Sequence, residues 1–119
     1  MKNFDDTVYL YFSEEDGCWI AQSLRTDQVG TGIDMGRALA DLIRAVDQVV
    51  DFARQDKTIQ IFCDAPKEVQ DRAALAKPLP LEIFEIAHRI ARGQWPDELA
   101  IVSRDEAGSF VGKMTESVC

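Results

Sequence analysis

The fold is decided by residues 34–55, which read DMGRALADLIRAVDQVVDFARQ. Apolar residues recur there at steps of three and four, a spacing that gathers them on one face of an α-helix. They are Ala38, Leu39, Leu42, Ile43, Val46, Val49, Val50 and Ala53. Asp34 is the expected N-cap, because its carboxylate can accept hydrogen bonds from the amides of the first turn. The stretch therefore predicts a long amphipathic helix over residues 35–55.

A hairpin is predicted ahead of this helix. Residues 7–13 are rich in aromatic and β-branched side chains, which favour a strand. The dipeptide Asp16-Gly17 then favours a tight turn, since glycine adopts positive φ without strain. Residues 18–25 form the expected return strand. Its apolar residues on one face are Cys18, Ile20 and Leu24.

A third strand is expected over residues 28–32, which contain Gly30 and Gly32. Glycine at alternate strand positions indicates a bend or a place where another backbone comes close. The pair could also belong to a phosphate-binding loop, but no GxGxxG or GK[ST] pattern follows, so we favour the structural role. A fourth strand is expected over residues 58–63, which gives the order β-β-β-α-β.

The residues that follow predict a helical extension. Residues 67–75 could form a short helix, and residues 81–92 have the apolar spacing of a second amphipathic helix. Pro78 and Pro80 break the chain between them, because proline lacks an amide donor and restrains the residue before it. Gly93 is expected to end the second helix.

From residue 97 onward the sequence allows two interpretations. The apolar residues 99–102 and 110–111 could be strands of a second hairpin, or the segment could be a flexible tail. The chain as a whole is predicted to be α+β, with an antiparallel sheet of three to four strands packed against one long helix. The expected parts are 1–65 for the sheet and long helix, 66–96 for the helical extension and 97–119 for the hairpin or tail.

Charge and composition limit the function classes. The 119 residues carry a net charge of −8, which disfavours binding to a nucleic-acid backbone unless the few cations cluster on one face. The three cysteines show no CxxC pattern, so neither a zinc site nor a disulfide framework is expected. No signal peptide or membrane span is visible, and we expect a cytoplasmic protein with reduced thiols.

No set of catalytic or metal-binding residues is expected. His88 is the only histidine and lies in a predicted helix without a catalytic motif, so a packing or surface role is favoured over a general base. The acidic residues 14–16 lack the spacing of a calcium loop and are more typical of a solvated turn. Asp5, Asp16 and Asp34 could form a nuclease cluster that needs two metals, which is a third hypothesis. The prediction is a protein that is not an enzyme and needs no cofactor.

Two groups of residues are candidates for binding. Aromatic side chains on adjacent strands beside an acidic turn suit a protein interface, because aromatic residues dominate binding energy. These candidates are Tyr9, Tyr11, Glu14, Glu15, Asp16 and Trp19. The alternative is that a second layer, for instance the 81–92 helix, covers the aromatic residues. Arg89 and Arg92 could contact DNA, although the acidic residues near them are more typical of a solvated helix.

The order of these features has a parallel in a known family. A first strand over residues 8–13 leads into residues 15–21, EDGCWIA, which combine the acidic turn, an aromatic residue and the return strand. Residues 29–34, VGTGID, then precede a helix that contains Ala38-Leu39. In order, spacing and residue type, the first fifty residues resemble the HicB family, the antitoxins of HicA–HicB toxin–antitoxin pairs.

The resemblance implies that the partner is a small basic RNase toxin, which the antitoxin binds and blocks. It also implies a cytoplasmic bacterial or phage protein that is usually a homo-oligomer, with an amino-terminal domain likened to an RNase H fold without activity. Family members often repress their own operon through a carboxy-terminal DNA-binding module. Dimeric DNA binding through residues 64–119 is therefore the alternative function, and a stand-alone HicB-like domain with another partner is a further one.

Overall fold

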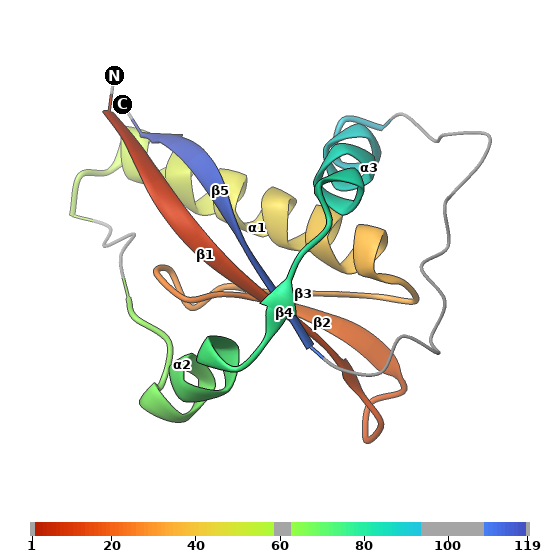
Figure 1. Cartoon of the computed structure of the whole chain (residues 1–119). Coiled ribbons are helices and arrows are strands. Elements are labelled where there is room, and N and C mark those ends of the chain that lie inside the picture. The colour runs from red at the N-terminus through yellow and green to blue at the C-terminus, as the bar shows by residue number, and fades with distance from the viewer. Residues whose placement is uncertain (1, 59–62, 94–108, 119) are drawn as a thin grey trace.

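A computed structural model describes residues 2–58, 63–93 and 109–118 of the chain. Its elements, in chain order, are β1 Lys2–Ser13, β2 Cys18–Ser23, β3 Val29–Gly32, α1 Met35–Gln55, α2 Lys67–Ala74, β4 Lys77–Pro78, α3 Leu81–Ala91 and β5 Ser109–Val118. Figure 1 shows the long helix α1 packed along the sheet. The α+β class is therefore confirmed, and α1 has the bounds that the sequence predicts.

The sheet has five strands in the order β3-β2-β1-β5-β4. The central strand, β1, pairs antiparallel with β2 on one side and with β5 on the other. β3 is antiparallel to β2, whereas β4 runs parallel to β5, so the sheet is mixed. Because β5 follows β1 along its length, the two ends of the chain lie together (Figure 1).

Two predicted strands fall wholly or mostly outside the described residues. The strand expected over 58–63 includes residues 59–62, and the hairpin strand over 99–102 lies entirely outside. Residues 110–111 do belong to a strand, β5, which pairs with β1 and β4. Pro78, predicted as part of a break, contributes to the two-residue strand β4, since an edge strand tolerates proline.

One face of the sheet, the α1 face, is fully packed. The strand register pairs Leu10 with Ala21 and Phe12 with Trp19, so these side chains share one face. On this face Val8, Leu10, Trp19 and Ala21 are all buried. Two helices cover this face, α1 and α3, and the buried residues of all these elements form one cluster. This cluster is the main core of the protein.

The other face, the α2 face, is only partly covered. A smaller cluster joins Tyr9 of β1 to Ala65, Val69 and Ala73 of the α2 region. Cys18 and Ile20 do share a face, as the sequence predicts, but it is this second face and not the packed one. Trp19 takes the core side because it has far more apolar surface to bury than its neighbours.

Gly30 and Gly32 allow α1 to lie directly against β3. A Cβ atom at Gly30 would be 2.5 Å from the Ala38 carbonyl oxygen, and one at Gly32 would be 2.5 Å from the Ala38 amide nitrogen. Real Cβ atoms do not approach backbone this closely, so the two positions require glycine. The close backbone approach predicted from the glycine spacing is confirmed.

Polar contacts fix the ends of the helices. Asp34 is the N-cap of α1, as predicted, and its Oδ1 accepts a hydrogen bond from the Arg37 amide at 2.8 Å. Arg44 donates from Nη2 to the Ile90 carbonyl oxygen at 2.7 Å, which ties the middle of α1 to the last turn of α3. Gly93 follows α3 with φ of +80°, the left-handed conformation expected at a helix end.

Candidate protein-binding surface

The three aromatic residues predicted to form one exposed group lie on different faces of the sheet. Tyr9 and Tyr11 stack on the α2 face with ring centroids 5.1 Å apart. Trp19 is on the α1 face, 1% exposed, with its ring centroid 5.8 Å from that of Phe12. Trp19 is therefore a core residue, and the prediction that it contributes to a binding surface is wrong.

The two tyrosines also differ from each other. Tyr9 is buried in the smaller cluster with Val69 and Ala73, so a second layer does cover it. The covering helix is α2 and not the 81–92 helix considered from the sequence, which packs on the opposite face. Tyr11 is only half-buried, and burial raises the pKa of its hydroxyl further above neutral. Like any tyrosine at neutral pH it is protonated and can donate a hydrogen bond.

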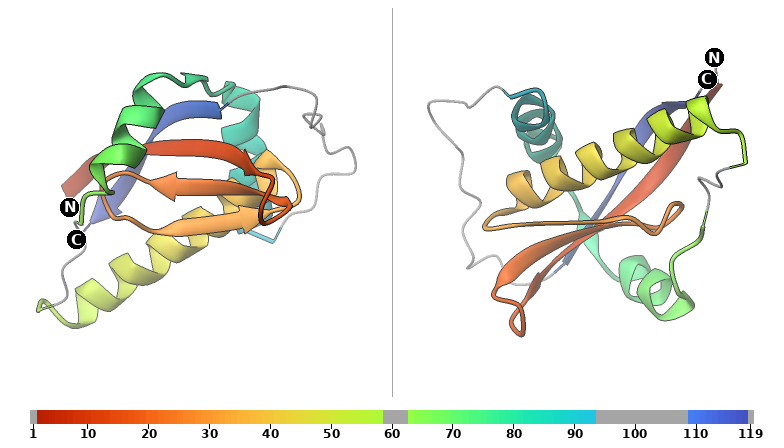
Figure 2. Two further views of the ribbon diagram at one scale, coloured as in Figure 1. Left: turned by 90° about the horizontal axis from the view of Figure 1, so that it is seen from below. Right: turned by 180° about the vertical axis from the view of Figure 1, so that it is seen from behind.

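Beyond α2, no helix among the described residues covers this face of the sheet (Figure 2). In the left view of Figure 2, no described helix lies in front of β2 and β3, while α2 lies over one side of the sheet. We name this region the open half-face. Its residues are Tyr11, Cys18, Ile20, Gln22, Val29 and Thr31. Thr31 is exposed and the Val29 side chain is 47% exposed, so apolar and polar groups both reach solvent here.

An acidic turn lies at one end of the open half-face. Glu14, Glu15 and Asp16 are exposed at the tip of the β1–β2 hairpin. The turn is held by Ser13, whose Oγ donates to Asp16 Oδ2 at 3.1 Å, and by Gly17, whose amide donates to the Ser13 carbonyl at 2.8 Å. The turn therefore holds these carboxylates at the end of the sheet where β1 meets β2.

Acidic residues also lie at the other end and along the free edge. Asp27, in the turn between β2 and β3, accepts a hydrogen bond from Gln22 Nε2 at 2.8 Å. Asp41 reaches from α1 to the edge strand, where its Oδ2 accepts from the Thr31 amide at 3.0 Å. The open half-face is therefore bordered by carboxylates on three sides. The hydrogen bond from the Thr31 amide to Asp41 also occupies a backbone donor on the edge strand with which a further strand could otherwise pair.

A buried carboxylate lies behind this surface, on the α1 face. Asp6 and Ser23 are both 0% exposed, and Ser23 Oγ donates to Asp6 Oδ2 at 2.6 Å. Thr26 Oγ1 donates in turn to Ser23 Oγ at 2.7 Å. Burial raises the pKa of Asp6, and the hydrogen bond from Ser23, which lowers it, offsets this only in part. Because the three side chains are sealed from solvent, we assign them to holding the turn after β2 against β1.

The acidic residues considered for a nuclease site have other surroundings. Asp16 belongs to the hairpin turn, and Asp34 caps α1 and forms an ion pair with Arg37. The side chain of Asp5 lies outside the described set. Within residues 2–58, 63–93 and 109–118, no three His, Cys, Asp or Glu side chains are grouped so that they could hold a metal ion.

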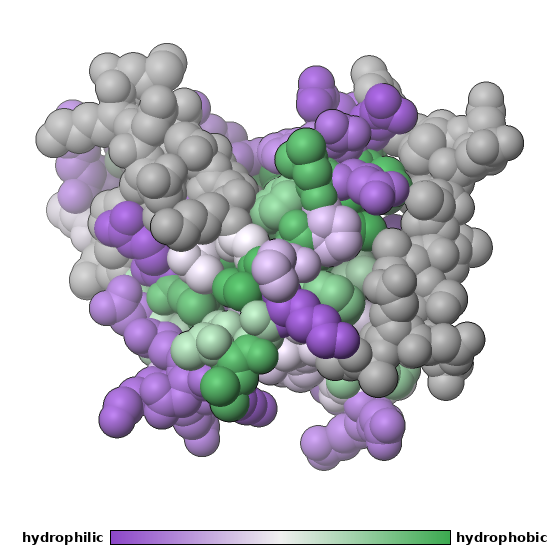
Figure 3. Space-filling model, viewed as in Figure 1, coloured by the Kyte–Doolittle hydropathy of each residue, from purple (hydrophilic) through white to green (hydrophobic). Residues whose placement is uncertain are grey.

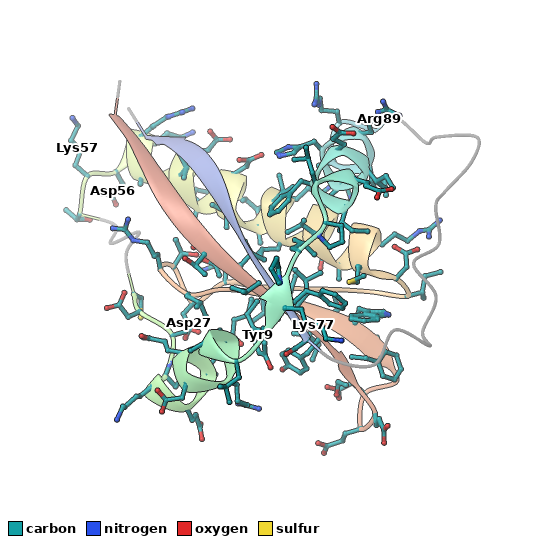
Figure 4. All side chains as sticks on the ribbon, in the orientation of Figure 1. Tyr9, Asp27, Asp56, Lys57, Lys77 and Arg89 are labelled. Atoms are coloured by element: carbon teal, nitrogen blue, oxygen red, sulfur yellow. The ribbon has the colours of Figure 1, made fainter. Side chains whose placement is uncertain are left out.

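The arginines considered for DNA contact are remote from the open half-face. Arg89 and Arg92 are exposed at the end of α3, and Arg92 Nε donates to the His88 carbonyl oxygen at 3.2 Å. Figure 4 shows Arg89 at the far end of α3 from the sheet and well away from Tyr9. The only histidine, His88, is half-buried on the same helix.

Most of the open half-face could not be identified from the sequence. Ile20 and Val29 were identified as strand residues, but single-strand alternation does not say which face a helix will cover. The contact of Asp41 with Thr31 depends on how α1 lies on the sheet, which the sequence of the helix does not specify. Only Tyr11 and the acidic turn 14–16 were identified in advance.

Comparisons with known proteins identify no relative of this chain. No described helix has both the length and the apolar character needed to cross a membrane. No family model matches the chain, and neither a curated protein nor a solved structure matches it significantly.

Proposed function

We propose that this chain is a HicB-like antitoxin, a non-enzymatic protein that neutralises a small basic RNase toxin by binding it on the open half-face. The observation that carries the proposal is the position of that surface, a partly apolar patch of sheet with acidic turns at both ends of β2. Such a surface suits a basic protein, since apolar contact at the centre and opposite charges at the rim are the usual anatomy of an interface.

The charge of the surrounding region supports a basic partner. Residues 1–58 contain eleven Asp and Glu but only six Lys and Arg. Oppositely charged partners associate faster, because the long-range field steers their encounter. Rim carboxylates at positions 14–16 would act mainly on the association rate, which falls as salt screens them.

The centre of the open half-face supplies groups that could hold a bound partner. Tyr11 offers a ring face and a protonated hydroxyl, and tyrosine is enriched among residues that dominate interface energy. Ile20 and Val29 offer apolar side chains on the two neighbouring strands. This arrangement binds a complementary surface without any chemical step, which fits the roles assigned above to Asp6 and Asp34.

The direct test uses the product of the small basic open reading frame expected beside this gene. Expression of that neighbour alone should arrest growth and cleave RNA, and co-expression of this chain should restore growth. The purified chain should also inhibit RNA cleavage by the purified neighbour. If the neighbour is toxic and its toxicity is unchanged by this chain, the antitoxin function is excluded.

A matched pair of variants tests the surface itself. Val29→Lys places a positive charge on the open half-face, where Val29 is 47% exposed. Phe52→Lys places the same charge on α1, at a residue that is 54% exposed. Calorimetry with the catalytically inactivated neighbour should show binding weakened about tenfold or more by Val29→Lys and little by Phe52→Lys. Equal affinity for both variants would place the interface elsewhere.

The alternative function, DNA binding through residues 64–119, has less support. Residues 64–93 contain five acidic and five basic residues, so Arg89 and Arg92 do not belong to a basic surface of net positive charge. A gel shift with the chain's own upstream DNA at low salt tests this function, and we expect no shift.

A further inference from the structure

The second edge of the sheet, formed by β4, carries two of the three most exposed large apolar side chains among the described residues. Leu75, which ends α2, is 89% exposed, and Leu81, which begins α3, is 72% exposed. Between them lie Lys77 and Pro78, the exposed residues of β4. We name Leu75, Lys77, Pro78 and Leu81 the β4 edge surface. Figure 3 faces this edge and shows green, apolar residues among purple, polar ones over β4 and the adjoining ends of α2 and α3.

The exposed side chains of Leu75 and Leu81 contribute little to the core of the chain itself. Leu79, between the two prolines, already turns inward, and its amide donates to the Val111 carbonyl oxygen at 2.8 Å. Leu75 and Leu81 point away from that core. Exposed apolar side chains that cluster at one edge of a small domain are typical of an interaction site.

The backbone of this edge limits how a partner can attach. Pro78 and Pro80 have no amide hydrogen, and β4 is only two residues long, so another strand cannot extend the sheet here. The partner must instead pack through side chains against the two leucines and Pro78.

The charge of this region differs from that of the rest of the molecule. Residues 64–93 have five acidic and five basic residues, whereas residues 1–58 are strongly acidic. A second copy of this chain would therefore meet no net repulsion at the β4 edge surface, although it would be repelled at the open half-face. Exposed side chains of both signs occur in this part of the chain, with Lys77 in β4 and Glu82 in the first turn of α3, and a two-fold contact can place opposite charges on the two copies near each other.

We infer that two copies of the chain pair through the β4 edge surface about a two-fold axis. Such a contact uses the same patch on both copies, so it closes at a dimer and does not propagate into filaments. The β3 edge, with the open half-face beside it, is at the opposite side of the sheet and stays accessible in both copies. The dimer would thus present two partner-binding surfaces, and it does not depend on whether the proposed antitoxin function holds.

Sedimentation equilibrium of the purified full chain without any partner tests the inference. The wild type should be dimeric at tens of micromolar, and Leu75→Glu/Leu81→Glu should weaken the dimer at least tenfold, as should Leu75→Lys/Leu81→Lys. Both leucines are exposed, so circular dichroism should show unchanged folding. Phe52→Glu, a substitution at an exposed apolar residue away from this edge, is the matched control and should leave the dimer intact.

Mixing the two charged variants separates a two-fold contact from other arrangements. An equimolar mixture of the Glu form and the Lys form should recover a dimer, because opposite charges then face each other across the axis. A wild type that is monomeric at these concentrations overturns the inference. So does a mixture that remains monomeric, or a loss of dimer in Phe52→Glu equal to that in the leucine variants.

Discussion

The two faces of the sheet differ in how completely helices cover them. On the α1 face, two helices bury Val8, Leu10, Trp19 and Ala21 in a continuous core. On the α2 face, the short helix α2 covers Tyr9, and no helix among the described residues covers β2 and β3 (Figure 2). Adjacent residues of one strand, such as Trp19 and Ile20, therefore face a packed core and a solvent-accessible surface. Most of the buried apolar surface therefore lies on the α1 face, whereas strand residues of the α2 face remain in contact with solvent.

The largest expected effect compares these two neighbours directly. Trp19→Ala should lower the free energy of unfolding by about 4 kcal/mol, because it leaves a large cavity between Phe12 and Phe110. Ile20→Ala should lower it by only about 1 kcal/mol, since the side chain is half-buried on the open half-face. Urea unfolding of both variants measures the difference. Similar losses would mean that the two faces are not distinct in stability.

A second comparison uses neighbours in β3. Gly30→Ala should destabilise the fold by about 3 kcal/mol, because the new methyl group would collide with the backbone of α1 at Ala38. Thr31→Ala should change stability by less than about 0.5 kcal/mol, since it removes an exposed side chain and keeps the amide that Asp41 binds. Thermal unfolding followed by circular dichroism distinguishes the two. A tolerated Gly30→Ala would contradict the close approach of α1 to β3.

Breaking the buried network on the packed face should have a smaller effect. Ser23→Ala removes the hydroxyl that donates to Asp6 and accepts from Thr26, so it should cost about 2 kcal/mol. Chemical denaturation gives this value. The matched control is Ser13→Ala in the exposed hairpin turn, which should cost less than about 1 kcal/mol because water replaces the lost partner.

The pH dependence of stability reports on the same carboxylate. Since the pKa of Asp6 is raised in the folded state, folding binds its proton more tightly than the unfolded chain does. The Asp6 contribution is therefore most favourable below its unfolded pKa and declines as the pH rises through the folded value. Asp6→Asn should remove this decline, and unfolding curves recorded from acid to neutral pH compare the two proteins. A wild type and variant with parallel pH profiles would exclude a raised pKa.

The smallest expected effect on stability lies on the acidic turn. The triple substitution Glu14→Gln, Glu15→Gln and Asp16→Asn should change the free energy of unfolding by less than about 0.5 kcal/mol, because these side chains are exposed. If the proposed basic toxin is the partner, the same variant should bind it with a slower association rate and a weaker salt dependence. Stopped-flow measurements at two salt concentrations check this outcome. An unchanged association rate would remove the steering role of the turn.

The elements that the sequence predicts well are those defined by local chemistry. Helix α1 begins at a capping aspartate and follows a regular apolar spacing, so both of its ends are visible from residues 34–55 alone. The turn at Gly17 and the close approach of α1 at Gly30 can likewise each be predicted from a single glycine. Such features need no knowledge of the distant chain.

The features that could not be predicted depend on contacts between distant segments. Which face of β2 enters the core is decided by α1 and α3, and the alternation of Trp19 with Ile20 allows either answer. The pairing of β5 with β1 and the cover of Tyr9 by α2 join segments far apart in sequence. The candidate site was predicted only in part for the same reason, because an uncovered surface is defined by helices that lie elsewhere.

The pairing of β1 with β5 also constrains the order of events during synthesis. Tyr11 pairs with Ser109, so roughly 100 residues must leave the ribosome before the central strand acquires its second neighbour. Until then the hairpin and α1 can form, but one edge of β1 stays unpaired. We expect completion of the sheet to be a late and comparatively slow step, during which the nascent chain is most exposed to proteases and to aggregation.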